Sequence, residues 1–194
     1  MDVRLRSWIT AIAQRRSSLL AIALQQRAKF EHWLKFELAE TAISNGASSV
    51  EIEPVGTGEG AGIRGDVAFT YEGNRYHVEL KTPNTNCRMP GAWQLTRPIT
   101  KNIAEIVQDG RKPPLPDPER IIAFAMFPVP PSDDRWHTYL DRVSEELTIA
   151  LTEANNASRV DVTLPDGHHA ELVIVTFTVP RTAPFSIAGS TPCR

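Results

Sequence analysis

Hydrophobic and polar residues alternate with a period of two across residues 66–81, on both sides of the pair Gly73-Asn74. The apolar members of this alternation are Val67, Phe69, Tyr71, Tyr76, Val78 and Leu80. Alternation interrupted by a glycine–asparagine pair predicts a β-hairpin with a two-residue turn. A turn at Gly73-Asn74 is expected to pair Phe69 with Val78 across the hairpin.

The polar face of this hairpin carries the candidate chemistry. The expected register sets Asp66 opposite Lys81 and sets Glu79 diagonal to Asp66. Diagonal side chains in a sheet have Cβ atoms about 7–8 Å apart. Two carboxylates at that spacing can share one divalent cation, with the lysine ammonium beside them. The pattern therefore predicts a metal-dependent hydrolytic site. The alternative is that the same acidic and basic residues form ordinary cross-strand charge pairs.

Hydrophobic spacing in the rest of the chain predicts further helices and strands. The expected helices cover residues 5–44, with a break near 15–18, then 98–110 and 133–153. The expected strands cover residues 50–55, 121–129, 159–164 and 170–179. The side chains expected on the buried side of the first helix are those of Trp8, Ile12, Leu19 and Ile22. This order predicts an α/β fold, a three-layer-like sandwich with a mixed central β-sheet flanked by helices.

Turn and cap residues mark several of the expected boundaries. Ser132 is the expected N-cap of the helix at 133–153, and Gly110 the expected end of the helix before it. Asp166-Gly167 predicts the turn of a second hairpin. The glycine-rich segment 56–62 lacks the lysine and hydroxyl of a phosphate-binding loop, so a surface loop is expected there.

Length and composition favour one main globular domain. The chain has 194 residues, of which 41% are hydrophobic and 23% are charged. We expect an N-terminal helical extension at residues 1–28, the main domain at 29–180 and a tail at 181–194. The apolar run at 19–24 is too short for a membrane span or a signal peptide, so no membrane association is expected. Only two cysteines occur, which suits a cytoplasmic protein.

Net charge limits the expected partners. The formal charge is −2, so any contact with a polyanion must come from local basic patches. The basic residues that flank the candidate site in sequence are Arg64, Arg88, Arg97, Lys101, Arg111 and Lys112. Each of them could contact a phosphate, but solvated surface charge is the more ordinary interpretation of each.

The order of these elements resembles a known nuclease superfamily. A helix that carries a glutamate precedes three strands with Asp66 and then Glu79-Leu80-Lys81, and a helix and another strand follow. This arrangement resembles the core of the PD-(D/E)xK nuclease superfamily, the restriction-endonuclease-like fold, over roughly residues 29–130. Gly65 stands where the superfamily's name has proline. The resemblance implies that Asp66, Glu79 and the Leu80 carbonyl hold Mg²⁺ or Mn²⁺.

Two glutamates compete for the helix position of this site. At about 100° per residue, Glu37 points between Phe30 and Leu34, in the middle of the apolar stripe of its helix. A buried carboxylate needs a cationic or metal-linked partner, so we favour Glu37 as the fourth site residue and place Glu31 second. A glutamate paired with a lysine or arginine at the margin of the stripe is an equally good interpretation.

The function expected from these residues is metal-dependent hydrolysis of a phosphodiester bond in nucleic acid. A DNA endonuclease is the leading expectation, while RNA and substrates other than nucleic acid stay open. One alternative is a non-catalytic module that binds nucleic acid or protein on a nuclease-like scaffold. Another is an unrelated α/β domain, which predicts that the Asp66 and Glu79 side chains diverge. A chain of this size lacks a separate recognition domain, so a homodimer is one expected source of specificity.

Overall fold

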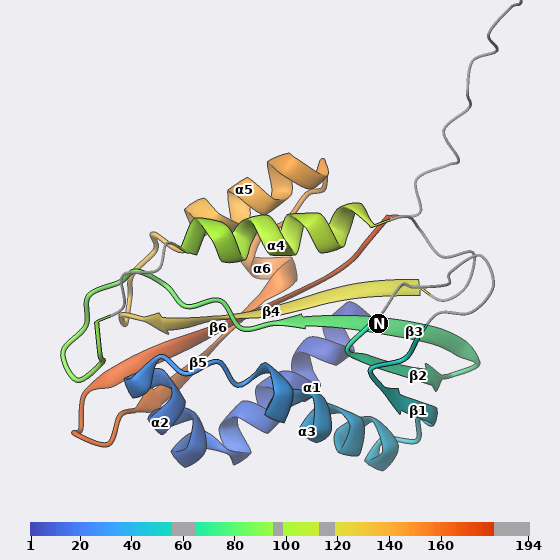
Figure 1. The fold of residues 1–194 in the computed structure, drawn as a ribbon, viewed down its shortest axis with the longest axis horizontal. Helices are drawn as coiled ribbons and strands as arrows, with labels where there is room; N and C mark the ends of the chain where they lie inside the picture. Colours follow the sequence, from blue (N-terminus) through green and yellow to red (C-terminus); the bar gives the residue numbers. More distant parts are fainter. Residues whose placement is uncertain (56–64, 95–98, 113–118, 181–194) are drawn as a thin grey trace, which may run out of the picture.

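The protein forms a three-layer α/β/α arrangement (Figure 1). The structure is a computed structural model and describes residues 1–55, 65–94, 99–112 and 119–180. Its helices are α1 (Asp2–Arg15), α2 (Ser17–Gln26), α3 (Glu31–Ser44), α4 (Ile99–Arg111), α5 (His137–Leu147) and α6 (Glu153–Asn156). Its strands are β1 (Ser48–Ile52), β2 (Val67–Tyr71), β3 (Asn74–Lys81), β4 (Glu119–Val129), β5 (Ala157–Thr163) and β6 (His169–Thr178). The expected glycine-rich loop at 56–62 and the tail at 181–194 lie outside the described residues.

The six strands form one mixed sheet in the order β1-β2-β3-β4-β6-β5. Strands β3 and β4 are parallel, and every other neighbouring pair is antiparallel. Helices α4 and α5 cover one face, while α1, α2 and α3 cover the other (Figure 1). The expectation of an α/β sandwich with a mixed central sheet is therefore confirmed. None of the described helices is long and apolar enough to cross a membrane.

The alternation in the first hairpin correctly predicts which residues face which layer, but the predicted register is wrong. The turn residues are Glu72 and Gly73, both with positive φ (49° and 80°), and Tyr71 pairs with Asn74. Positive φ at both positions is typical of a type I′ hairpin turn, which favours glycine at its second position. Val67 consequently pairs with Val78, a shift of two residues. A two-residue shift keeps every side chain on its face and changes only its opposite neighbour.

The expected N-terminal helix is divided into three helices. The predicted break near residues 15–18 is confirmed at Arg16, and a second break falls at Arg27, which has a φ of 54°. Because α2 restarts at Ser17, its helical phase differs from that of α1. Leu19 and Ile22 are therefore exposed, contrary to expectation, and Leu20 is buried instead.

Residues 1–28 share a core with the sheet. The residues of α1 and α2 in this core are Leu5, Trp8, Ile9, Ile12, Ala13, Leu20, Ala21 and Leu24. They belong to the same hydrophobic cluster as Val78 of β3 and Ile174 of β6. The segment expected as an extension thus covers part of one face of the sheet.

Other boundaries differ from expectation near α5. This helix begins at His137, while Ser132 has a φ of 61° and no capping role. Helix α6 is separate and is capped by the Thr152 hydroxyl, which accepts from the Asn155 N–H at 3.3 Å. Gly110 lies inside α4, and a Cβ there would come within 2.6 Å of Leu147, so glycine permits close approach of α4 and α5. The turn at Asp166-Gly167 is confirmed, with Gly167 at a φ of 87°.

Candidate active site

Asp66 immediately precedes β2 and bonds to the backbone of β3. Its N–H donates to the Val78 carbonyl at 3.0 Å, and its carboxylate Oδ2 accepts the Leu80 N–H at 2.7 Å. The carboxylate thus accepts the Leu80 N–H in place of a backbone carbonyl of the neighbouring strand. Leu80 is the residue between Glu79 and Lys81. Asp66 is not opposite Lys81 as expected, yet it lies next to the predicted Glu-x-Lys segment. Its negative charge contributes to raising the pKa of both Glu79 and Lys81.

Glu79 points toward α4 and forms an ion pair there. It alternates with Val78 and Leu80, which face α1–α3, so its side chain lies on the opposite face of the sheet. Lys112 Nζ, just after α4, lies 2.9 Å from Glu79 Oε1. Burial raises the pKa of Glu79, and the ammonium of Lys112 opposes that shift. Glu79 is therefore a buried carboxylate that requires a cation.

Lys81 pairs with Asp109 in the last turn of α4. Its Nζ lies 3.1 Å from Asp109 Oδ2, and the other oxygen of Asp109 lies 2.7 Å from Lys112 Nζ. Burial lowers the pKa of Lys81, but Asp109, Glu31 and Asp66 together raise it above its ordinary value. Lys81 is thus an ammonium ion at neutral pH.

Helix α3 contributes an acid and a base to the same cluster. Lys35 Nζ lies 3.0 Å from Asp66 Oδ1 and 2.9 Å from Glu53 Oε1. Glu31 precedes Lys35 by one helical turn and faces the same direction. Burial raises the pKa of Glu31, the charge of Lys81 lowers it, and that of Asp66 raises it further. Glu31 therefore lies within electrostatic range of Asp66 and Lys81.

Glu37, the favoured helix acid, lies in a different environment. Its carboxylate pairs with Arg15 Nη2 and Arg16 Nη2, both at 2.9 Å, and is nearly buried. Burial raises its pKa, but the two guanidinium groups lower it more strongly. The break at Arg16 brings both arginines over α3, so Glu37 has the cationic partner expected of it without joining the site. This is the arginine-paired alternative given above for Glu37, so the choice of helix acid between Glu37 and Glu31 stays a prediction.

Arg120 of β4 bonds to the backbone of the segment that carries Asp109 and Lys112. Its guanidinium donates to the carbonyl of Asp109 at 2.9 Å and to that of Lys112 at 2.8 Å. These carbonyls belong to the C-terminal end of α4, where backbone acceptors lack helical partners. Arg120 therefore fixes the turn that carries the two side chains joined to Glu79 and Lys81.

Lys35 and Asp109 are not among the residues predicted from the sequence, and Lys112 was expected to carry solvated surface charge. Spacing alone offered two signals: Lys35 lies one turn after Glu31, and Asp109 lies three residues before Lys112. Neither signal shows that the two pairs converge, because α3 and α4 cover opposite faces of the sheet. Of the other flanking basic residues, Arg64 and Arg97 lie outside the described residues.

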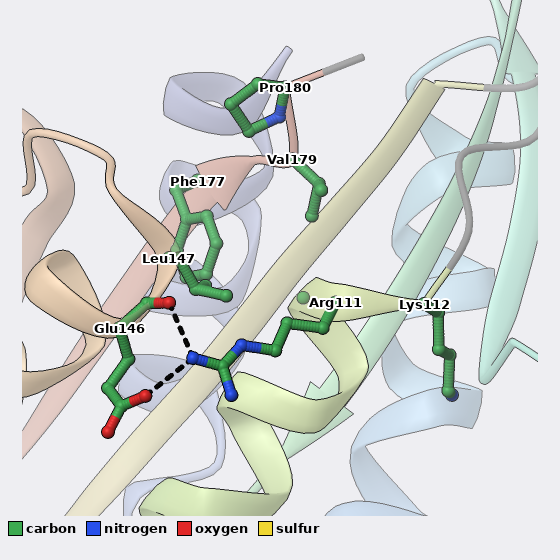
Figure 2. Close-up of a pocket in the computed structure, with 8 residues that line it drawn as sticks. Arg111, Lys112, Glu146, Leu147, Phe177, Val179 and Pro180 are labelled. Atoms are coloured by element: carbon green, nitrogen blue, oxygen red, sulfur yellow. Dashed lines mark hydrogen bonds and ion pairs between the residues drawn. The ribbon is translucent and has the colours of Figure 1, made fainter. Parts of the chain in front are cut away.

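Arg111 belongs to a pocket next to the cluster. This pocket has a volume of about 230 Å³ and is lined by Gly110, Arg111, Lys112, Glu146, Leu147, Phe177, Val179 and Pro180. Arg111 Nη2 donates to the carbonyl of Glu146 at 2.9 Å and to its Oε2 at 2.6 Å (Figure 2). Figure 2 shows the Lys112 side chain directed away from this ion pair. The pocket therefore adjoins the candidate site without containing Asp66, Glu79 or Lys81.

The donor chemistry at Asp66 and Glu79 fits a magnesium or manganese ion. Mg²⁺ is commonly held by one or two carboxylates and keeps several of its waters. The Leu80 N–H donates to Asp66. In a β-strand the N–H and C=O of one residue point toward the same neighbouring strand, so the Leu80 carbonyl is directed to the Asp66 side as well. Within the described ranges no group of three or more His, Cys, Asp and Glu side chains is placed to hold a metal. The ligands that these residues could supply are the two carboxylates and the Leu80 carbonyl.

Comparison with known proteins leaves the family open. No protein-family model, no curated protein and no solved structure matches this chain.

Proposed function

We propose that this protein is a metal-dependent nuclease that hydrolyses phosphodiester bonds, with DNA as its expected substrate. One observation carries the proposal: the Asp66 carboxylate accepts the Leu80 N–H, between Glu79 and Lys81, at 2.7 Å. Its charge acts on both of those side chains, and Glu31 of α3 acts on Lys81. The order of elements also supports it. A helix bearing an acid, three antiparallel strands, a helix and a strand parallel to the third follow one another from α3 to β4, as the resemblance to the PD-(D/E)xK superfamily implies.

Asp66 and Glu79 would hold the ion together with the Leu80 carbonyl. When bound, a divalent ion lowers the pKa of a water molecule and neutralises charge on the phosphate. Glu31 would contact the ion through water, the role first considered for Glu37. Its raised pKa also suits a group that accepts a proton from the attacking water.

Lys81 would stabilise the negative charge that develops on the phosphate. A raised pKa keeps its side chain protonated, which suits a hydrogen-bond donor better than a general base. Asp109 holds the ammonium at 3.1 Å and limits its rotation. A preorganised charge of this kind lowers a barrier without reorganising during the reaction.

A non-catalytic binding module is the second candidate, and one observation favours it. Each of the two carboxylates already pairs with an ammonium group, Asp66 with Lys35 and Glu79 with Lys112. A cluster neutralised in this way is stable without a metal ion. This candidate predicts nucleic-acid or protein binding with no cleavage.

Cleavage of supercoiled plasmid with Mg²⁺ or Mn²⁺ tests the proposal. We expect the wild type to nick the plasmid, EDTA to abolish nicking, and Asp66→Asn and Lys81→Ala to remove it while their circular dichroism is unchanged. Lys101→Ala, which changes an exposed lysine of α4, is the matched control and should nick normally. Linear and single-stranded substrates identify the preferred form. Equal nicking by the wild type and Lys81→Ala would refute the proposal.

A further inference from the structure

Both carboxylates of the candidate metal site carry an ammonium group at contact distance. Lys35 Nζ lies 3.0 Å from Asp66 Oδ1, and Lys112 Nζ lies 2.9 Å from Glu79 Oε1. The two lysines come from opposite faces of the sheet, since Lys35 belongs to α3 and Lys112 follows α4. Each acid therefore has its own ammonium partner, and the two partners come from different helical layers.

Neither lysine is a freely moving surface side chain. Only 6% of the Lys35 side chain is exposed, and it is held between Asp66 and Glu53. The Lys112 side chain is 32% exposed, and Asp109 Oδ1 holds its Nζ at 2.7 Å. Ordered ammonium groups next to buried carboxylates supply the positive charge that such carboxylates otherwise obtain from a metal.

A divalent ion cannot simply be added to this arrangement. Mg²⁺ bonds to oxygen at about 2.0–2.1 Å, so an ion on the same carboxylate would lie within a few ångströms of the ammonium nitrogen. Like charges at that distance repel strongly where water is largely excluded. The carboxylate must therefore release its lysine, or share it at a cost, before it binds the ion.

We propose that Lys35 and Lys112 act as competing cations that set the metal affinity of Asp66 and Glu79. Lys112 is the one that leaves, because it is the more exposed of the two and keeps Asp109 as a partner. Lys35 stays on Asp66 and limits the site to a single, weakly held ion. This inference rests on the proposed metal site and adds a control on its occupancy.

Direct titration with Mn²⁺ tests this inference without any nucleic acid. Electron paramagnetic resonance measures free Mn²⁺ in solutions of the wild type, Lys112→Met, Lys35→Met and the control Lys101→Met. We expect Lys112→Met to bind Mn²⁺ about tenfold more tightly than the wild type, an effect of about 1.4 kcal/mol. Lys35→Met should gain affinity as well, and Lys101→Met should not. Asp66→Asn should abolish the gain in a double variant with Lys112→Met.

Folding is checked independently by urea unfolding of each variant in EDTA. If Lys35→Met fails to fold, Lys112→Met and Lys112→Gln still test the inference, because Lys112 is partly exposed. Unchanged or weaker Mn²⁺ binding in both Lys112 variants would overturn it, and so would an equal gain in Lys101→Met. Tighter binding without plasmid nicking would support the competing lysines and refute the nuclease. Nicking by the wild type with unchanged affinity in the variants would refute the competing lysines alone.

Discussion

Lys81 and Asp109 form an ion pair of 3.1 Å that joins the end of β3 to the last turn of α4. Asp109 also contacts Lys112, which in turn contacts Glu79, so one carboxylate links both functional residues of the Glu-x-Lys segment. Arg120 holds the backbone of this turn. The position of the ammonium of Lys81 therefore depends on the C-terminal end of α4 as well as on its own strand.

Asp109→Asn should slow the reaction by releasing Lys81. The amide keeps the shape of the side chain but carries no charge to hold two ammonium groups. We expect kcat for nicking to fall by about tenfold, with little change in KM, which corresponds to about 1.4 kcal/mol of transition-state stabilisation. Glu105→Gln on the same helix is the control. An Asp109→Asn variant with wild-type kcat would show that the ion pair has no part in catalysis.

Glu31 and Glu37 should have separable roles. Glu37→Gln breaks the contacts with Arg15 and Arg16 and should lower the free energy of unfolding by about 1–3 kcal/mol while nicking is retained. Glu31→Gln should reduce nicking severely and keep the fold. Urea unfolding and plasmid nicking on both variants decide the matter. Loss of nicking in folded Glu37→Gln would identify Glu37, and not Glu31, as the helix acid of the site.

The sequence correctly predicts which face of the sheet each hairpin residue occupies. Side chains in a strand alternate between the two faces, so an error of two residues in register does not change the face of any residue. Glu79 and Lys81 therefore remain on the face covered by α4. Opposed pairs were not predictable in the same way, because the positive φ of Glu72 moved the turn by one residue. The Asp66 carboxylate joins the site through the Leu80 N–H, a contact that no alternation pattern encodes.

The remaining site residues depend on long-range packing. Glu37 lies in the apolar stripe of its helix, as its spacing predicts, but the break at Arg16 supplies its partners from the N-terminal segment. Asp109 and Lys112 meet β3 only because the parallel crossover from β3 to β4 places the end of α4 beside it. Local spacing carries no information on such a meeting.

Arg27 should be essential for the stability of the segment that follows β3. Its guanidinium donates to three backbone carbonyls, those of Thr85, Cys87 and Trp93. Arg27→Lys can replace one of these contacts and leaves the other two carbonyls, which are buried or partly buried, without this donor, so we expect a loss of about 2–3 kcal/mol. Chemical denaturation measures it against Arg88→Lys, an exposed control. Equal stability of the two variants would contradict this role.

Glu171 should contribute to the pH dependence of stability. Burial raises the pKa of Glu171. The charge of Arg159 opposes this shift, while the charges of Asp161 and Asp134 add to it. The folded state thus binds this proton more tightly than the unfolded state, so the contribution is fully present below the unfolded pKa and is lost as pH rises through the folded one. Glu171→Gln should gain stability relative to the wild type between about pH 4 and pH 7. Urea unfolding across this range checks it, with Glu145→Gln, at an exposed position, as the control. A constant difference between Glu171→Gln and the wild type over that range would contradict this prediction.

The most direct test of the account is the position of a bound manganese ion. Crystals of Lys112→Met grown with MnCl₂ and measured at the manganese absorption edge would show the ion as an anomalous peak. We predict one peak bonded to both Asp66 and Glu79, with Lys81 beside it. A peak bonded to neither carboxylate, or none at saturating Mn²⁺, would contradict the claim that these residues form a metal-dependent active site.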